Sequence, residues 1–251
     1  MRLILVSLVI CALCLLPALA PLMQFGVPYL GILRIPATFL DYIAVVVHEL
    51  GHVILRWSYG YPALPALAFR DGGGVVYPFD RNIWVLFAFY GVATAAFCWG
   101  MGRRIWWFAA LVSILTGLHL ILAFNYRHEA LCNYMGHAAE VLLAVFCIVR
   151  AARGEKMGGW ADQYFNMVFG MYVMGRNIIL CLTACAVDVT QDADAQRGGH
   201  ILRDFDQIAA VAGTSVQHVA LFGLAFTTLC ALTAMAVAIF LPPRERLGTI
   251  K

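Results

Sequence analysis

The stretch VVVHELGHVILRW, residues 45–57, places two histidines and a glutamate in a run that is otherwise almost wholly apolar. Ionisable side chains inside a membrane-spanning helix are costly, by about 2.5–3.5 kcal/mol each on insertion scales. Three of them on neighbouring positions therefore need a shared partner. On a helix, positions i and i+4 lie on one face, so His48 and His52 can reach the same metal ion. We predict a helix that carries a metal site within the membrane.

The composition around this stretch is that of a membrane protein. Of 251 residues, 63% are hydrophobic and 12% are charged, whereas soluble domains are about half apolar and a quarter charged. A spanning helix needs about 20 mainly apolar residues. Windows of this kind cover 3–20, 36–57, 83–101, 105–124, 130–149, 164–187 and 216–241. We predict one domain over residues 1–251, an all-α polytopic bundle of six or seven transmembrane helices in a lipid bilayer.

The first window, residues 1–20, fits two interpretations. A basic start at Arg2, an apolar middle and a small-residue end are typical of a cleavable signal peptide. The same stretch is also suited to a first transmembrane helix. The sequence leaves both open.

Charge excludes one class of partner and suggests an orientation. The net charge is +3, and Lys and Arg are spread over short connections, so we expect no nucleic-acid binding. With seven spans, the odd-numbered connections carry Arg34, Arg103, Arg104, Arg150, Arg153, Lys156, Arg244, Arg246 and Lys251. The positive-inside rule places that side in the cytoplasm, and hence the metal site on the non-cytoplasmic side. Arg2 alone favours the opposite orientation.

Residues 48–52, HELGH, form an HExxH arrangement. In such an arrangement two imidazoles bind zinc, and the glutamate takes a proton from the zinc-bound water. We therefore expect Zn²⁺ as the cofactor, His48 and His52 as ligands, and Glu49 as the catalytic base. The alternative is a cluster of buried polar residues without a metal.

HELGH in a hydrophobic helix, followed by a glycine-rich hairpin and further spans, resembles the site-2 protease family of intramembrane zinc metalloproteases. The resemblance covers residues 40–85 and implies hydrolysis of a peptide bond in a membrane protein or peptide substrate. It also implies His48 and His52 as ligands and Glu49 as base. The usual third ligand of that family is an aspartate in an Asn-Pro…Asp-Gly segment on a later helix. This chain has no such segment, so either its third ligand comes from elsewhere or the chain is a divergent or inactive relative.

The fifth window offers two candidates for the third ligand. His137 and Glu140 are three residues apart and share a helix face, and they lie at about the depth of His48 and His52 at a rise of 1.5 Å per residue. Gly136 allows a neighbouring helix to come close. We choose Glu140 as the ligand, with His137 as the alternative, because two histidines and a glutamate form a common catalytic set.

Further polar residues gather on the same side. Arg176 and Asn177 in the sixth window are expected either to orient Glu140 or stabilise an oxyanion, or to form a plain structural salt bridge. His200 and Asp204 follow two glycines, four residues apart. They suit a lid, a residue that supports a ligand, or an alternative ligand; an idle helix start in an exposed loop is equally compatible.

The segment LAFRDGGGVVYPF, residues 67–79, predicts a β-hairpin around Asp71, Gly72, Gly73 and Gly74. A protease must unwind a helical substrate before cleaving it, and an exposed strand edge can hold the substrate extended by strand addition. We therefore expect this hairpin to bind substrate. An ordinary turn facing solvent is the alternative.

Two functions from different classes follow. The first is a membrane-embedded zinc metalloprotease. The second is a non-proteolytic membrane protein, with a structural zinc site, that binds a partner or transports a solute. A closed site of four protein ligands favours the second function, whereas three ligands plus water favour the first.

Overall fold

The computed structural model describes residues 2–19, 31–68, 73–154, 158–186 and 200–240. These residues form eight helices and one two-stranded sheet. The elements are α1 (Arg2–Leu19), α2 (Gly31–Ser58), β1 (Ala63–Ala68), β2 (Gly73–Pro78), α3 (Ile83–Gly102), α4 (Trp106–Ala123), α5 (His128–Arg153), α6 (Trp160–Ala186), α7 (His200–Ala212) and α8 (Val216–Phe240).

The predicted fold class is confirmed. Six helices are long and apolar enough to cross a membrane, namely α2, α3, α4, α5, α6 and α8, and the apolar part of α1 is shorter. Every apolar window of the sequence forms a helix. The additional helix, α7, lies within the predicted long connection between the last two windows.

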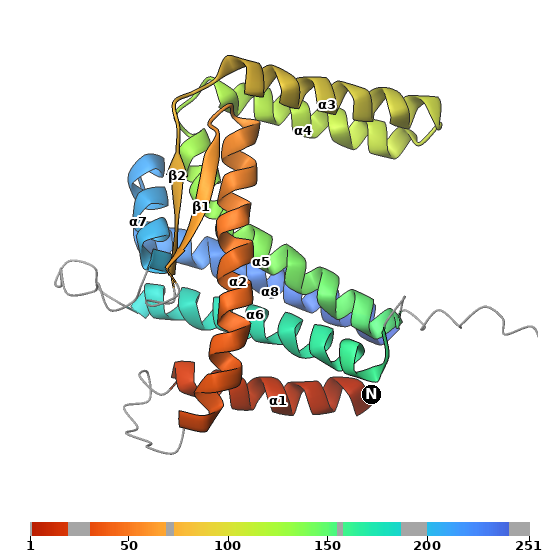
Figure 1. Cartoon of the computed structure of the whole chain (residues 1–251), viewed down its shortest axis with the longest axis vertical. Coiled ribbons are helices and arrows are strands. Elements are labelled where there is room, and N and C mark those ends of the chain that lie inside the picture. Colours follow the sequence, from red (N-terminus) through yellow and green to blue (C-terminus); the bar gives the residue numbers. More distant parts are fainter. Residues whose placement is uncertain (1, 20–30, 69–72, 155–157, 187–199, 241–251) are drawn as a thin grey trace, which may run out of the picture.

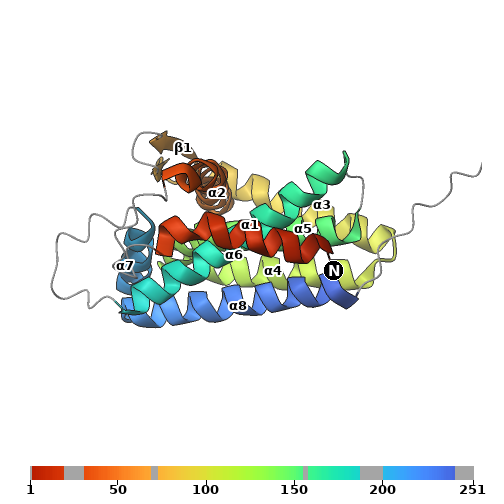
Figure 2. The same ribbon diagram turned by 90° about the horizontal axis from the view of Figure 1, so that it is seen from below.

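The long helices do not all run in the same direction. Figure 1 shows α1, α3, α4, α6 and α8 lying nearly parallel, with α5 oblique to them, while α2 runs across the set. Figure 2, turned by 90°, looks along α2 and shows the others from the side. The N-terminus and the turn between α3 and α4 lie at one end of the aligned helices. The hairpin and α7 lie at the other end, close to α2.

Small residues let the helices around α5 approach closely. A Cβ atom on Gly51 of α2 would lie 2.6 Å from the carbonyl oxygen of Met135 on α5. A Cβ atom on Gly170 of α6 would lie 2.7 Å from the carbonyl oxygen of Ala144, also on α5. In membranes such contacts replace the hydrophobic driving force, since lipid is as apolar as the helices. They hold the HELGH helix directly against α5.

The predicted hairpin is also present. Strands β1 and β2 are antiparallel, with Ala63 opposite Pro78 and Ala68 opposite Gly73. Trp57 of α2 donates a hydrogen bond from Nε1 to the Ala63 carbonyl oxygen at 2.8 Å, which ties the hairpin to the end of the HELGH helix. Of the predicted turn residues, Asp71 and Gly72 lie outside the described residues.

Candidate metal centre

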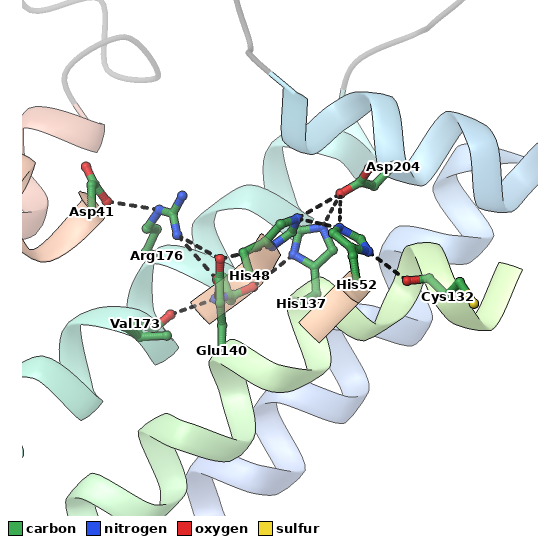
Figure 3. A network of polar contacts seen from close by, with 10 residues as sticks. Asp41, His48, His52, Cys132, His137, Glu140, Val173, Arg176 and Asp204 are labelled. Carbon is green, nitrogen blue, oxygen red and sulfur yellow. Dashed lines mark hydrogen bonds and ion pairs between the residues drawn. The ribbon is translucent and has the colours of Figure 1, made fainter. Parts of the chain in front are cut away.

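The HELGH residues lie buried on the face of α2 that meets α5 and α7. His48, Glu49 and His52 are each 5% exposed or less. Since His48 and His52 are one helical turn apart, their rings come together, and the two Nε2 atoms are 3.0 Å apart. Figure 3 shows both rings turned toward Asp204.

Two other helices direct side chains at this pair. Asp204 of α7 places Oδ2 at 2.9 Å from Nε2 of His48 and 3.4 Å from Nε2 of His52. His137 of α5 places its Nε2 at 4.0 Å from the same oxygen. In Figure 3 these four side chains meet from three different helices.

The contacts of the three Nδ1 atoms indicate which ring nitrogen carries the proton in each histidine. Each Nδ1 faces an oxygen that only accepts hydrogen bonds. The contacts are His48 to a Glu140 carboxylate oxygen at 3.1 Å, His52 to the Cys132 carbonyl oxygen at 2.7 Å and His137 to the Asn177 side-chain oxygen at 3.3 Å. A neutral imidazole that donates from Nδ1 carries a lone pair on Nε2. In this tautomer all three Nε2 atoms present lone pairs to the same small space.

Lone pairs that face one another repel unless a cation lies between them. Nε2 of His137 is buried and has no hydrogen-bond partner among the described residues, as expected for an atom reserved for another ligand. Tetrahedral zinc with bonds of 2.0–2.1 Å keeps its ligand atoms about 3.3 Å apart. The separations among His48, His52 and Asp204 are 2.9, 3.0 and 3.4 Å. These three residues fit a zinc ion.

Space for such an ion depends on Gly136 of α5. A Cβ atom there would lie 2.5 Å from Nε2 of His52 and 2.6 Å from Nε2 of His48. A larger residue would therefore fill the space toward which both ring nitrogens point. The glycine makes room for the metal-binding atoms as well as for helix packing.

Glu140 lies in the site, but on the outer side of His48. Among the described residues, two groups of side chains have metal-binding atoms that all lie within 4.8 Å of one another: His48, His52 and Asp204, and His48, His137 and Glu140. In the second group Glu140 faces Nδ1 of His48, whereas His52 and Asp204 face Nε2. A carboxylate in that position accepts the outer proton of a metal ligand and fixes the ring orientation.

Asp204 is held in the form that a metal ion requires. Burial alone would raise the pKa of its carboxyl group, but hydrogen bonds from His48 and His52, which form when their Nε2 atoms carry protons in the metal-free protein, outweigh burial and hold the pKa below its usual range. The carboxylate therefore stays ionised at neutral pH, and ligands must be deprotonated to bind a metal.

Arg176 of α6 connects Glu140 to a second acidic residue. Its Nη1 lies 3.3 Å from Oε2 of Glu140, and its Nε lies 3.0 Å from Oδ1 of Asp41 on α2. Tyr172, one turn earlier on α6, donates a hydrogen bond to the same Asp41 oxygen at 2.9 Å. Asn177 donates to Glu140 at 2.7 Å. This network joins α2, α5 and α6 to one side of the three rings (Figure 3).

A polar pocket of about 150 Å³ opens next to the three fitting residues. Its lining consists of Glu49, His52, Arg56, Gly74, Val75, Val76, Asn133, Arg203, Asp204 and Gln207. Gly74 packs so tightly on the Glu49 side chain that a Cβ atom would overlap it. Strand β2 therefore forms one wall of the pocket, with Glu49 between the strand and the histidines.

Sequence reasoning singled out most of these residues but missed Asp41 and Arg56. Both were detectable, since Asp41 precedes His48 by two helical turns and Arg56 follows His52 by one, on the same face of the helix. His200 begins α7, and its side chain is outside the part of the structure that is described.

Comparison with known proteins adds no relative. The chain matches no protein-family model, no curated protein and no solved structure.

Proposed function

We propose that the protein is a zinc metalloprotease of the membrane, with His48, His52 and Asp204 as ligands and Glu49 as base. One observation carries the proposal: three atoms are spaced for tetrahedral zinc, and two of their residues, His52 and Asp204, line a polar pocket together with Glu49. Asp204 here takes the place that the sequence assigned to Glu140, which would instead orient His48. Three protein ligands are the number typical of catalytic zinc sites.

The residues of the chain then have separate tasks. When bound, zinc supplies a nucleophilic water at neutral pH and polarises the scissile carbonyl. Glu49 takes the proton of that water as its oxygen bonds to the carbonyl carbon. Glu49 then delivers this proton to the leaving amide nitrogen as the C–N bond breaks. Glu140 and the Cys132 carbonyl oxygen hold the rings of His48 and His52 in the orientation that binding requires.

The hairpin is suited to hold a substrate. Within the described ranges, strand β2 pairs with β1 on one edge and with no strand on the other. Gly74, Val75 and Val76 line the pocket. An extended peptide added to the free edge of β2 would have its backbone beside Glu49. A helical substrate segment must unwind to bind in this way.

The arrangement of the helices supports a placement in the membrane. With the aligned helices as spans, α2 begins and ends on the side of the hairpin and α7, and therefore does not cross the bilayer (Figures 1 and 2). The opposite ends of these helices carry Arg2, Arg103, Arg104, Arg150 and Arg153. By the positive-inside rule, all five arginines then favour placing these helix ends on the cytoplasmic side. Arg2 therefore agrees with the other four. The site would open to the non-cytoplasmic side.

A structural zinc site is the second candidate. It is favoured by the lone pair of His137 Nε2, which faces the same space as the other two. Were His137 a fourth ligand, the site would be closed to water. X-ray absorption on the zinc-loaded protein separates the two: a His137→Ala variant with unchanged zinc coordination supports the protease.

The deciding test combines metal content with hydrolysis. We expect about one zinc per chain, lost in a His48→Ala, His52→Ala double variant. Glu49→Gln should keep the zinc and the fold but slow hydrolysis by about 100- to 10,000-fold, since it removes the base and preserves its shape. Cleavage of a membrane-protein reporter at an unchanged rate by Glu49→Gln would refute the mechanism.

A further inference from the structure

Two arginines line the pocket, and neither has an acidic partner in the described part of the chain. Arg56 follows His52 by one turn of α2, and Arg203 adjoins Asp204 on α7. Among the described residues, neither guanidinium group forms an ion pair. Nη2 of Arg56 donates to the Asn133 side-chain oxygen at 3.1 Å, but its Nε is buried and lacks a hydrogen-bond acceptor in the described part of the chain.

The charges in the pocket leave these arginines available. The two carboxylates in the lining belong to Glu49 and Asp204. This inference rests on the proposed function, in which the site holds a divalent ion. The two carboxylates then offset the two charges of that ion. No further acidic residue lines the described pocket, so its lining supplies no other carboxylate to pair with the two guanidinium groups. A buried N–H without an acceptor is costly, and a carboxylate is the acceptor that fits a guanidinium best.

We propose that this pocket selects peptides with a carboxylate close to the scissile bond, bound by Arg56 and Arg203. The carboxylate belongs either to an acidic side chain or to the C-terminus of the peptide. Arg56 and β2 line the same pocket, so a peptide on the strand edge can place such a group beside Arg56 while its backbone stays near Glu49. The substrate class is thus an acidic peptide segment held extended.

Binding to the zinc-loaded Glu49→Gln variant in lipid nanodiscs tests this without turnover. The probes are fluorescent short peptides of one sequence, with Glu or Gln at successive positions and with a free or amidated C-terminus. We expect one Glu position, or the free C-terminus, to strengthen binding by about 10- to 100-fold. Adding Arg56→Gln should abolish that preference and Arg203→Gln should weaken it. The position that matters tells the two carboxylate sources apart.

Arg127→Gln is the matched control, because Arg127 is exposed and lies outside this pocket. Zinc content is measured for every variant, so that a folding defect is separated from a lost contact. Equal affinity for Glu and Gln peptides, or a preference that survives Arg56→Gln, would overturn the inference while leaving the protease intact. Failure of the wild-type protein to cleave any peptide faster than Glu49→Gln would overturn the proposed function as well.

Discussion

At the scale of single residues, Gly136 gives the sharpest test of a metal-binding space between the histidines. A Cβ atom on Gly136 would reach within 2.6 Å of both ring nitrogens, so Gly136→Ala must displace at least one imidazole. We expect this variant to lose most of its zinc, as measured by metal analysis of the purified protein. Gly117→Ala in α4 is the control, since a Cβ atom there meets nothing within 4 Å. Full zinc content in Gly136→Ala would place the ion elsewhere.

Asp204 and Glu140 are distinguished by how much zinc affinity each variant loses. Asp204→Asn replaces a charged ligand oxygen by a neutral amide and should abolish tight binding. Glu140→Gln keeps an oxygen near Nδ1 of His48 but weakens its hold on the ring, which typically costs about 10- to 100-fold in metal affinity. Competition with a chelator of known affinity measures both. The reverse order of effects would restore Glu140 as the ligand chosen from the sequence.

At the scale of the elements, the Asp41–Arg176–Glu140 network fastens three helices together. Glu140 is 2% exposed, and Arg176 is its ion-pair partner. Arg176→Met leaves this carboxylate without a cation, so we expect about 3–5 kcal/mol of lost stability in unfolding measured in mixed micelles. Arg150→Gln breaks a half-exposed pair with Asp162 and should cost about 1 kcal/mol or less.

A double variant keeps the origin of that loss clear. Glu140→Leu together with Arg176→Met removes both charges and should recover part of the stability, because the cost lies in an unpaired charge rather than in a missing contact. No recovery would mean that Arg176 acts through packing alone.

The angles at which the helices cross were harder to predict from the sequence than the residues at which the helices begin and end. Apolar length located every long helix, because the bilayer sets that length, and turn chemistry located the hairpin. Counting residues for depth assumed that α2 runs alongside α5. In the structure α2 crosses α5 where Gly51 meets Met135, a contact that depends on tertiary packing.

Ligand geometry was only partly accessible from the sequence for a related reason. Spacing along a helix indicates which residues share a face, and it brought His137 and Glu140 correctly to the HELGH face. It cannot say which nitrogen of His48 a carboxylate will meet. That depends on α7, which contacts the histidines through Asp204. Asp204 lies 156 positions after His48 in the chain.

At the scale of the whole molecule, the crosswise α2 predicts an unusual topology that labelling can test. If α2 does not cross the bilayer, the connections before and after it lie on one side, and the turn between α3 and α4 lies on the other. A chain with seven spans would instead place the first connection on the same side as that turn. Single cysteines at Gln24, Asp80 and Arg103 sample these three connections.

We expect a membrane-impermeant thiol reagent, applied to sealed vesicles of known orientation, to label Gln24→Cys and Asp80→Cys from the same face. Arg103→Cys should react only from the opposite, cytoplasmic face, because it adjoins the cluster of basic residues. The unsubstituted protein corrects for its own cysteines. Grouping of Gln24→Cys with Arg103→Cys would show that the HELGH helix spans the membrane. The site would then lie deep in the bilayer, and substrates would have to unwind there rather than near the membrane surface.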